Sequence, residues 1–162
     1  GEQQPDTGTV TLGESVKVAY VGQIRDTLDN NKTVWEEVSG GLDILRIGDY
    51  EIASRAYIGR FNFKGQDQQN RVGELSGGER NRLQLAKILQ QGANVILLDE
   101  PTFGLDSHNT FELIKLFHER VQNGQTILMI THENEIINRY ATRRLTIKDE
   151  QLHVSGGESH VN

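Results

Sequence analysis

Two consecutive carboxylates close one of the most apolar segments of the chain. The run Val95–Leu98 is continuous and rich in leucine and β-branched residues, which is typical of a strand buried on both faces of a parallel sheet. Asp99 and Glu100 follow it directly, at the carboxyl end where open parallel sheets bind ligands. There, Asp99 is suited to hold Mg²⁺, and Glu100 to polarise a water molecule against a phosphate. The alternative is a strand end followed by an acidic turn that caps a helix.

A pair of glycines opens a predicted helix upstream of this strand. In Leu75-Ser-Gly-Gly-Glu79 the glycines leave backbone N–H groups free to approach an anion, and a helix N-terminus favours negative charge. Ser76 adds a hydroxyl donor. The same Ser-Gly-Gly sequence occurs in Val38–Gly41 and Val154–Gly157, but neither copy opens an amphipathic helix. We therefore interpret those two copies as turns and only the copy at 75–79 as a candidate anion site.

A histidine follows a second apolar segment, Thr126–Ile130, which we expect to be another buried strand. If the predicted strand Thr126–Ile130 runs parallel to Val95–Leu98, His132 lies at the same sheet edge as Asp99. An imidazole there can bond a phosphate oxygen, although a lone histidine is also compatible with a structural or solvated role. The other histidines show no ligand spacing with one another and predict no metal site of their own: His108, His118, His153 and His160.

The composition excludes several classes of protein. The 162 residues carry 17 Lys and Arg against 23 Asp and Glu, a net charge of −6, which argues against nucleic-acid or anionic-membrane binding through overall charge. There is no cysteine, so disulfides, cysteine metal sites and thiol catalysis are excluded. No apolar run is long enough to span a bilayer, and no apolar N-terminal segment suggests secretion. A cytoplasmic protein of one domain is expected.

Hydrophobic periodicity predicts an α/β arrangement around these motifs. A helix capped by Ser76 runs to about Gln91 and leads into the strand Val95–Leu98. A helix capped by Ser107 then connects this strand to Thr126–Ile130, which makes a βαβ unit and implies a parallel sheet. Its predicted inner face holds Phe111, Ile114, Phe117 and Val121. The other expected elements are strands Thr9–Leu12 and Val16–Val21, helices Thr33–Val38, Glu51–Gly59 and Glu133–Tyr140, an exposed loop Lys64–Arg71, a hairpin of Arg144–Lys148 with Leu152–Val154, and a frayed tail from Ser155.

Taken together, the motifs resemble the ATP-binding cassette (ABC) ATPases in order and spacing. Leu75–Glu79 is similar to the ABC signature, Val95–Glu100 to the Walker B strand with its glutamate, Gly104–Asp106 to the D-loop, and His132 to the switch histidine. By the same match, Gln23 resembles the Q-loop glutamine that touches the metal and the attacking water. The resemblance implies a P-loop-nucleotidase-like, mostly parallel sheet with a helical subdomain. It divides one cassette into core strands at 1–25, the helical subdomain at 26–92, the core at 93–154 and a tail at 155–162.

In this family two cassettes enclose ATP head to tail. The resemblance implies that the signature, with Ser76, Gly77, Gly78 and Glu79, faces the γ-phosphate of a nucleotide held on a partner cassette. Asp106 would touch that opposing cassette. Asp99, Glu100, Gln23 and His132 would serve Mg²⁺ and the nucleotide on this chain's own P-loop.

A P-loop, Gly-x-x-x-x-Gly-Lys-[Ser/Thr], is absent from the 162 residues, since none of the lysines follows a glycine. The chain therefore resembles a cassette without its Walker A strand and helix, and we expect it to bind ATP weakly alone. The missing strand normally lies inside the sheet, so we expect a partner chain in the gap, self-association through the open edge, or a rearranged sheet.

The resemblance changes character along the chain. Residues 1 to about 80 resemble the translational-throttle group of ABC-F translation factors, whereas residues from about 93 are similar to the ATPases of energy-coupling-factor and cobalt importers. Thr102-Phe-Gly-Leu-Asp106 and Thr131-His-Glu133 both depart from the ABC-F pattern. One hypothesis is a mosaic, natural or engineered, joined between Leu83 and Asn94, and the alternative is a single divergent lineage. The two halves suggest different partners, the ribosome or a membrane transporter subunit.

Three functions follow from these observations. The first is a truncated or engineered ABC ATPase cassette. The second is a non-catalytic assembly module that docks on another cassette through its signature helix. The third is an ATPase completed by a P-loop from a separate chain.

Overall fold

The centre of the molecule is a three-stranded parallel sheet. In the computed structural model, which describes residues 5–21, 28–48 and 50–156, the order is β1-β4-β5, with β1 at Val18–Val21, β4 at Val95–Asp99 and β5 at Thr126–Ile130. Both pairings are parallel. Helix α4 (Ser107–Gln122) connects β4 to β5. The predicted βαβ unit is therefore confirmed.

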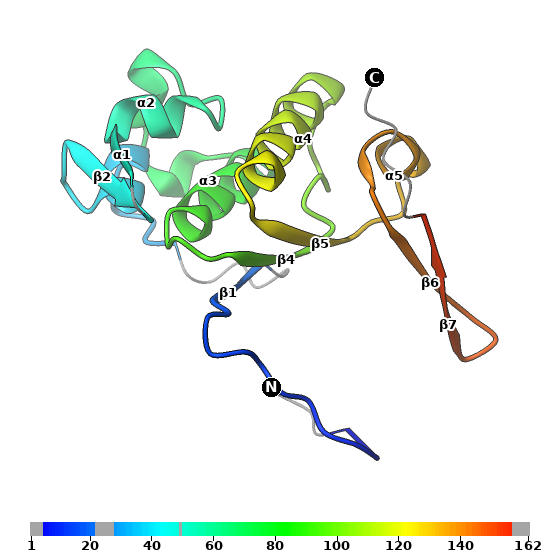
Figure 1. Cartoon of the computed structure of the whole chain (residues 1–162). Helices are drawn as coiled ribbons and strands as arrows, with labels where there is room; N and C mark the ends of the chain where they lie inside the picture. Colours follow the sequence, from blue (N-terminus) through cyan, green and yellow to red (C-terminus); the bar gives the residue numbers. More distant parts are fainter. Residues whose placement is uncertain (1–4, 22–27, 49, 157–162) are drawn as a thin grey trace.

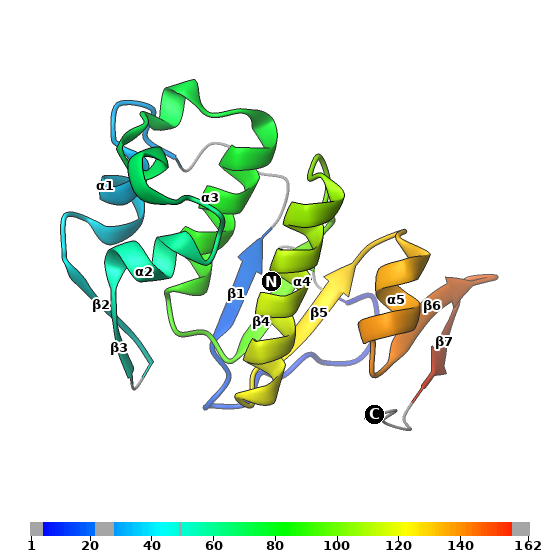
Figure 2. The ribbon, with the colours of Figure 1, turned by 90° about the horizontal axis from the view of Figure 1, so that it is seen from above.

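Helices cover one face of this sheet. Figures 1 and 2 show α3 (Gly77–Leu89) and α4 lying on the same side of the three strands. Alternate strand residues point toward these helices and are buried: Ala19, Val21, Ile96 and Leu98. Because successive strand side chains point to opposite faces, the remaining residues line the other side.

The other face of the sheet is open in the described part of the chain. Tyr20, Leu97 and Leu128 share one row of the register, and Tyr20 and Leu128 are 56% and 46% exposed. Ile130 is 61% exposed. The expectation that Thr126–Ile130 is a buried strand is therefore wrong, because no described helix or strand covers this face. Among the described strands, β5 has a neighbour on one side only.

A second group of elements packs against α3. Helix α1 begins after Thr33, whose hydroxyl accepts a hydrogen bond from the Glu36 N–H while the Glu36 carboxylate accepts from the Thr33 N–H. It packs against α2, α3 and a 3₁₀ helix. The bounds are α1 Val34–Ser39, β2 Ile44–Ile47, β3 Tyr50–Ala53, α2 Ser54–Gly59, and 3₁₀ helices η1 Gly65–Gln69 and η2 Val72–Glu74.

Two predictions in this region are wrong. The expected helix Glu51–Gly59 is split, because residues 50–53 pair with β2 as an antiparallel hairpin before α2 begins at Ser54. The expected exposed loop Lys64–Arg71 contains η1 and buries Gln68, whose Nε2 donates to the carbonyl oxygens of Arg55 and Phe63. In both cases tertiary contacts outweighed the local pattern.

The remaining predictions are mixed. Helix α3 starts after Ser76 as expected, whereas α4 is capped by Asp106 and not by Ser107. Phe111 and Val121 are 49% and 41% exposed, contrary to the expected inner face. No strand forms at 9–12. The chain closes with α5 (Asn134–Tyr140) and the predicted hairpin, β6 (Arg144–Lys148) with β7 (Gln151–Ser155), while 157–162 lie outside the described residues.

No helix in the described ranges is long and apolar enough to cross a membrane.

One charged side chain is buried where α1 meets α3. The Glu37 side chain is 1% exposed, its Oε1 lies 2.5 Å from the Lys87 Nζ, and its Oε2 lies 3.8 Å from the Lys32 Nζ. A buried carboxylate is costly unless it is paired. Lys87 therefore compensates the charge that α1 brings into the interior.

We expect Lys87→Ala to lower the free energy of unfolding by about 3 kcal/mol, because it leaves the buried carboxylate without its close partner. Lys32 is half exposed and more distant, so Lys32→Ala should cost at most about 1 kcal/mol. Urea denaturation of both variants measures the difference. Equal losses would show that Glu37 does not depend on Lys87.

Candidate functional site

The predicted catalytic pair meets at the carboxyl ends of two neighbouring strands. Asp99 lies opposite Ile130 in the register, and the Glu100 N–H donates to the Ile130 carbonyl oxygen over 2.9 Å. Beyond these ends, the Nδ1 of His132 lies 2.9 Å from the Oε1 of Glu100. The sheet thus brings together two residues that are 32 positions apart in the sequence.

Glu100 has an unusual backbone conformation. Its φ is +46°, in the left-handed region that residues other than glycine rarely adopt. The turn Glu100–Phe103 begins here, with the Phe103 N–H donating to the Glu100 carbonyl oxygen. Non-glycine residues in this region cluster at functional sites, where the surrounding structure holds them. The conformation directs the carboxylate from the end of β4 toward His132.

The pairing changes the acid–base behaviour of the histidine. The hydrogen bond to Glu100 and its negative charge raise the pKa of His132, with a smaller contribution from Glu133. The His132 side chain is 79% exposed, so it is accessible to a ligand. The arrangement can donate a proton or hydrogen bond to an anion while it orients Glu100.

A second contact joins the same two strand ends. The Thr102 hydroxyl donates to the Glu133 carboxylate, and the Glu133 N–H donates to the Thr131 hydroxyl over 3.2 Å. Thr102 is buried. Sequence analysis gave these residues no chemical role, although Thr131 and Glu133 flank His132 and Thr102 lies two residues after Glu100. These hydrogen bonds connect the turn after β4 to the turn after β5.

The glycine pair opens α3 as predicted. The hydroxyl of Ser76 lies 2.6 Å from the Glu79 carboxylate, and the Glu79 N–H donates back to it. This hydrogen bond is the main cause that holds the pKa of Glu79 below its ordinary value. A Cβ at Gly77 would meet no atom within 4 Å, which leaves its backbone open to a ligand.

The neighbouring glycine is needed for packing. A Cβ on Gly78 would lie 2.8 Å from the carbonyl oxygen of Gly104, a distance that side chains essentially never adopt. Asn81 adds a hydrogen bond from its Nδ2 to the Pro101 carbonyl oxygen over 3.0 Å. The start of α3 therefore lies directly against the loop that follows β4.

Asp106 caps α4 through both carboxylate oxygens. They accept hydrogen bonds from the N–H of Asn109 over 2.8 Å and from its side-chain Nδ2 over 2.6 Å. These bonds hold the pKa of Asp106 below its ordinary value. Sequence reasoning missed Asn109, although a donor three residues after an Asp cap is a recognisable signal.

The remaining predicted ligand residues differ in how they are placed. Asp99 ends β4, and no side chain in the described part of the chain hydrogen-bonds to its carboxylate. The described residues contain no cluster of three or more carboxylate or histidine side chains able to hold a metal ion. Mg²⁺ commonly binds one or two carboxylates together with water and phosphate oxygens, so a single carboxylate fits it. Gln23 lies outside the described residues.

Comparisons with known proteins show the family and the fold of this chain. A family model described as ABC transporter matches residues 1–103, more than half of the chain. The chain belongs to the ABC transporter family. Solved structures support the fold: the ATP-binding cassette MJ0796, in a dimeric post-hydrolysis state bound to ADP and Pi, has a TM-score of 0.69 at 20% identity. That match covers 89% of this chain and 64% of the solved chain.

Curated relatives of this ABC chain include proteins named as translational throttles. The energy-dependent translational throttle protein EttA of Escherichia coli (strain K12) is 57% identical over 150 residues, which cover 93% of this chain and 26% of EttA. EttA of Mycobacterium tuberculosis (strain H37Rv) is 48% identical over 145 residues, which cover 90% of this chain and 25% of that protein. The ATP-binding protein Uup of Buchnera aphidicola is 33% identical over 162 residues, which cover 100% of this chain and 27% of Uup. The chain spans about a quarter of the length of these relatives.

We expect Glu100→Gln to lower the pKa of His132 toward its ordinary value of 6.5, because the variant removes the carboxylate that stabilises the imidazolium. The raised pKa means that the pair stabilises the fold fully below pH 6.5, and this contribution is lost as the pH rises through the raised value. An NMR titration of the His132 ring measures the shift.

The control for that titration is Glu112→Gln, which removes a carboxylate from α4 and should leave the His132 pKa unchanged. An identical His132 titration in Glu100→Gln and the unmodified chain would contradict the pairing.

Proposed function

We propose that this chain is the signature and Walker B part of an ABC cassette that hydrolyses ATP together with a P-loop outside the 162 residues. The observation that carries the proposal is the 2.9 Å contact between Glu100 and His132 at the ends of neighbouring parallel strands. In this role Glu100 polarises the attacking water and His132 donates to a phosphate oxygen. Phosphoryl transfer depends on positioned donors and carboxylates, and this edge of the sheet supplies them.

Each predicted residue has a role in this proposal. Asp99 would hold Mg²⁺, which neutralises phosphate charge when bound, and Gln23 would act beside it. Ser76, Gly77, Gly78 and Glu79 would face the γ-phosphate of a nucleotide held by a second cassette, with Gly77 offering its open backbone. Asp106 would contact that second cassette. The core at 1–25 and 93–154, the helical subdomain at 26–92 and the tail at 155–162 complete the proposed cassette.

The open face of the sheet supports completion by another segment. Parallel sheets are normally covered on both faces, yet Tyr20, Leu128 and Ile130 are exposed here. Apolar residues on β6 and β7 are also exposed, including Ile147 at 81%. We propose that the element carrying the P-loop covers the sheet beside β5. Self-association of this chain through the same edge is the alternative.

The test combines this chain with a fragment of the same family that carries the P-loop strand and helix. Alone, the chain should give no saturable heat when titrated with Mg·ATP, because no P-loop lysine or cradle is present in it. The mixture should hydrolyse ATP, with activity reaching its maximum when the chain and the P-loop fragment are present in a 1:1 molar ratio. Saturable binding by the chain alone would mean that another loop replaces the P-loop.

In that mixture, Glu100→Gln should lower kcat at least about a hundredfold while nucleotide remains bound, because the amide cannot act as a base. The matched control Glu112→Gln should keep full turnover. Steady-state hydrolysis and retained nucleotide are measured on the same samples. Unchanged turnover in Glu100→Gln would remove the proposed role, and binding without hydrolysis in the unmodified mixture would favour a non-catalytic assembly module.

Similarity to proteins named as translational throttles supports a role in translation. We propose that the completed cassette acts on the ribosome, in preference to a membrane transporter subunit. The 57% identity to one relative over 150 residues also favours a single divergent lineage over a mosaic. The departures in Thr102–Asp106 and Thr131–Glu133 would then be changes within that lineage.

We expect the completed cassette carrying Glu100→Gln to co-sediment with ribosomes in Mg·ATP and to be released when ATP is replaced by ADP. The non-hydrolysing variant is used because it retains the nucleotide that closes the site. Sucrose-cushion sedimentation followed by immunodetection measures the bound fraction. Equal sedimentation with ATP and ADP, or none with either, would count against a ribosomal partner.

A further inference from the structure

A line of side-chain contacts runs from the signature helix to the cap of α4. Arg82 of α3 is buried, and its Nε donates to the Phe61 carbonyl oxygen over 3.1 Å. Its guanidinium lies 5.4 Å from the centre of the Phe63 ring. Both aromatic residues are buried, so the signature helix holds the backbone on either side of Asn62.

Asn62 is set in a conformation that few residues accept. Its φ is +62°, where Asn, Asp and Gly are the tolerated residues. The turn is closed by the Asn62 N–H, which donates to the Gly59 carbonyl oxygen over 3.1 Å. From this turn the Asn62 side chain reaches Asn109 of α4, 47 positions away, with an Nδ2-to-Oδ1 distance of 2.8 Å.

Chemistry fixes the direction of every hydrogen bond in this line. The ionised Asp106 carboxylate only accepts, so Asn109 must direct its Nδ2 toward it, at 2.6 Å. The Oδ1 of Asn109 then faces Asn62, and Asn62 must donate with its own Nδ2. Asn109 is buried, so no water replaces a lost donor at low cost.

We propose that Asn62 is a positioning residue that couples the signature helix to Asp106, the residue expected to touch the opposing cassette. This inference rests on the proposed function. Arg82 sets the turn, Asn62 orients the Asn109 amide, and Asn109 orients the Asp106 carboxylate. The start of α3 also contacts the loop that leads to Asp106, through the close approach of Gly78 to Gly104 and the Asn81–Pro101 hydrogen bond. The signature and Asp106 therefore move as one unit.

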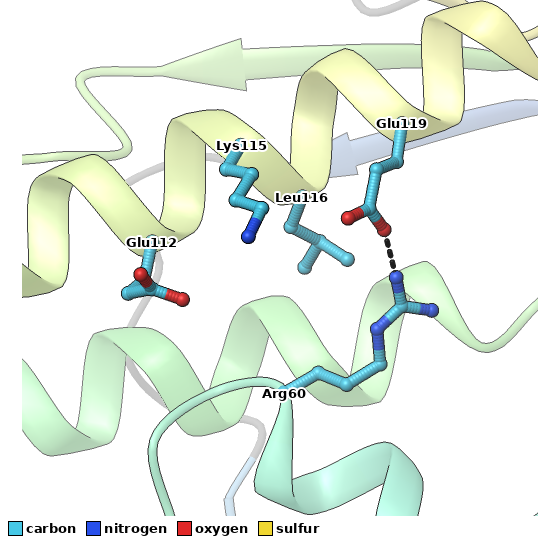
Figure 3. Close-up of a pocket in the computed structure, with 5 residues that line it drawn as sticks. All are labelled: Arg60, Glu112, Lys115, Leu116 and Glu119. Carbon is cyan, nitrogen blue, oxygen red and sulfur yellow. Dashed lines mark hydrogen bonds and ion pairs between the residues drawn. The ribbon is translucent and has the colours of Figure 1, made fainter.

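Two variants of Asn62 separate the side chain from the backbone turn. Asn62→Gly accepts the positive φ and removes the donor, whereas Asn62→Asp keeps the shape and presents an acceptor to the Asn109 Oδ1. The matched control is Arg60→Ala. Arg60 pairs with Glu119 of α4 (Figure 3). This pair also joins the end of α2 to α4, but it is not one of the contacts that form the line from Arg82 to Asp106.

Hydrogen exchange of the 162-residue chain tests the coupling without any ATPase assay. We expect the Asn109 N–H, which donates to Asp106, and the Leu105 N–H, which donates to Thr102, to exchange roughly three- to tenfold faster in Asn62→Gly, and faster still in Asn62→Asp. Arg60→Ala should leave both rates unchanged. Equal rates at these amides in all four proteins would overturn the inference.

The reconstituted ATPase gives a second readout. Asn62 touches no proposed nucleotide ligand, so Asn62→Asp should lower kcat roughly tenfold with KM for ATP unchanged, while Arg60→Ala keeps both. An active mixture in which Asn62→Asp keeps its kcat overturns the positioning role. An inactive unmodified mixture counts against the proposed function, and the exchange rates then decide the coupling alone.

Discussion

The parallel register between β4 and β5 is the constraint on which the site depends. It places Asp99 opposite Ile130 and lets the Glu100 N–H bond to the Ile130 carbonyl oxygen. Because both chains leave the sheet at the same edge, His132 arrives within hydrogen-bond distance of Glu100. A shift of one residue would turn every side chain of β5 to the other face and separate the pair. The chemistry of the site is therefore a consequence of backbone pairing far more than of local sequence.

The two faces of the sheet have different consequences. On the face under α3 and α4, Ile96, Leu98 and their neighbours are buried. Their packing against the helices fixes the register of the strands. The opposite face exposes a row of apolar side chains in the described residues, which is unfavourable in water. In the described part of the chain β5 is an edge strand of this sheet, and an edge strand presents backbone N–H and C=O groups to a further strand. Strand β5, whose end leads to His132, is thus also the strand beside which another element can pair.

Sequence reasoning succeeded where the signal was local or periodic. The Ser76 cap and the closing hairpin depend on residues close together in the chain, and the βαβ unit follows from the order and hydrophobic periodicity of its strands and helix. It also placed His132 at the same sheet edge as Asp99, because strand ends in a parallel sheet meet at one edge, but it did not predict the contact between His132 and Glu100. It could not anticipate Gln68, which is buried only because the carbonyls of two distant segments need a donor. The exposure of β5 depends on what covers the sheet, which no pattern inside the strand records.

Two residues near the site adopt a backbone conformation that residues other than glycine rarely adopt, and contacts with neighbouring residues keep them in it. Glu100 and Asn62 both have positive φ, and contacts from another element hold each of them. Glu100 is held by Ile130 and His132, and Asn62 by the contacts of Arg82 with its neighbours Phe61 and Phe63. Such conformations cost on the order of 1 kcal/mol or more, so they persist only while these contacts remain. Loosening the contact between α3 and the loop after β4 would therefore relax Asp106 and its surroundings before it unfolded the chain. Helix α3 thereby supports both segments: Asn81 bonds to the loop that follows β4, and Arg82 bonds to the turn that contains Asn62.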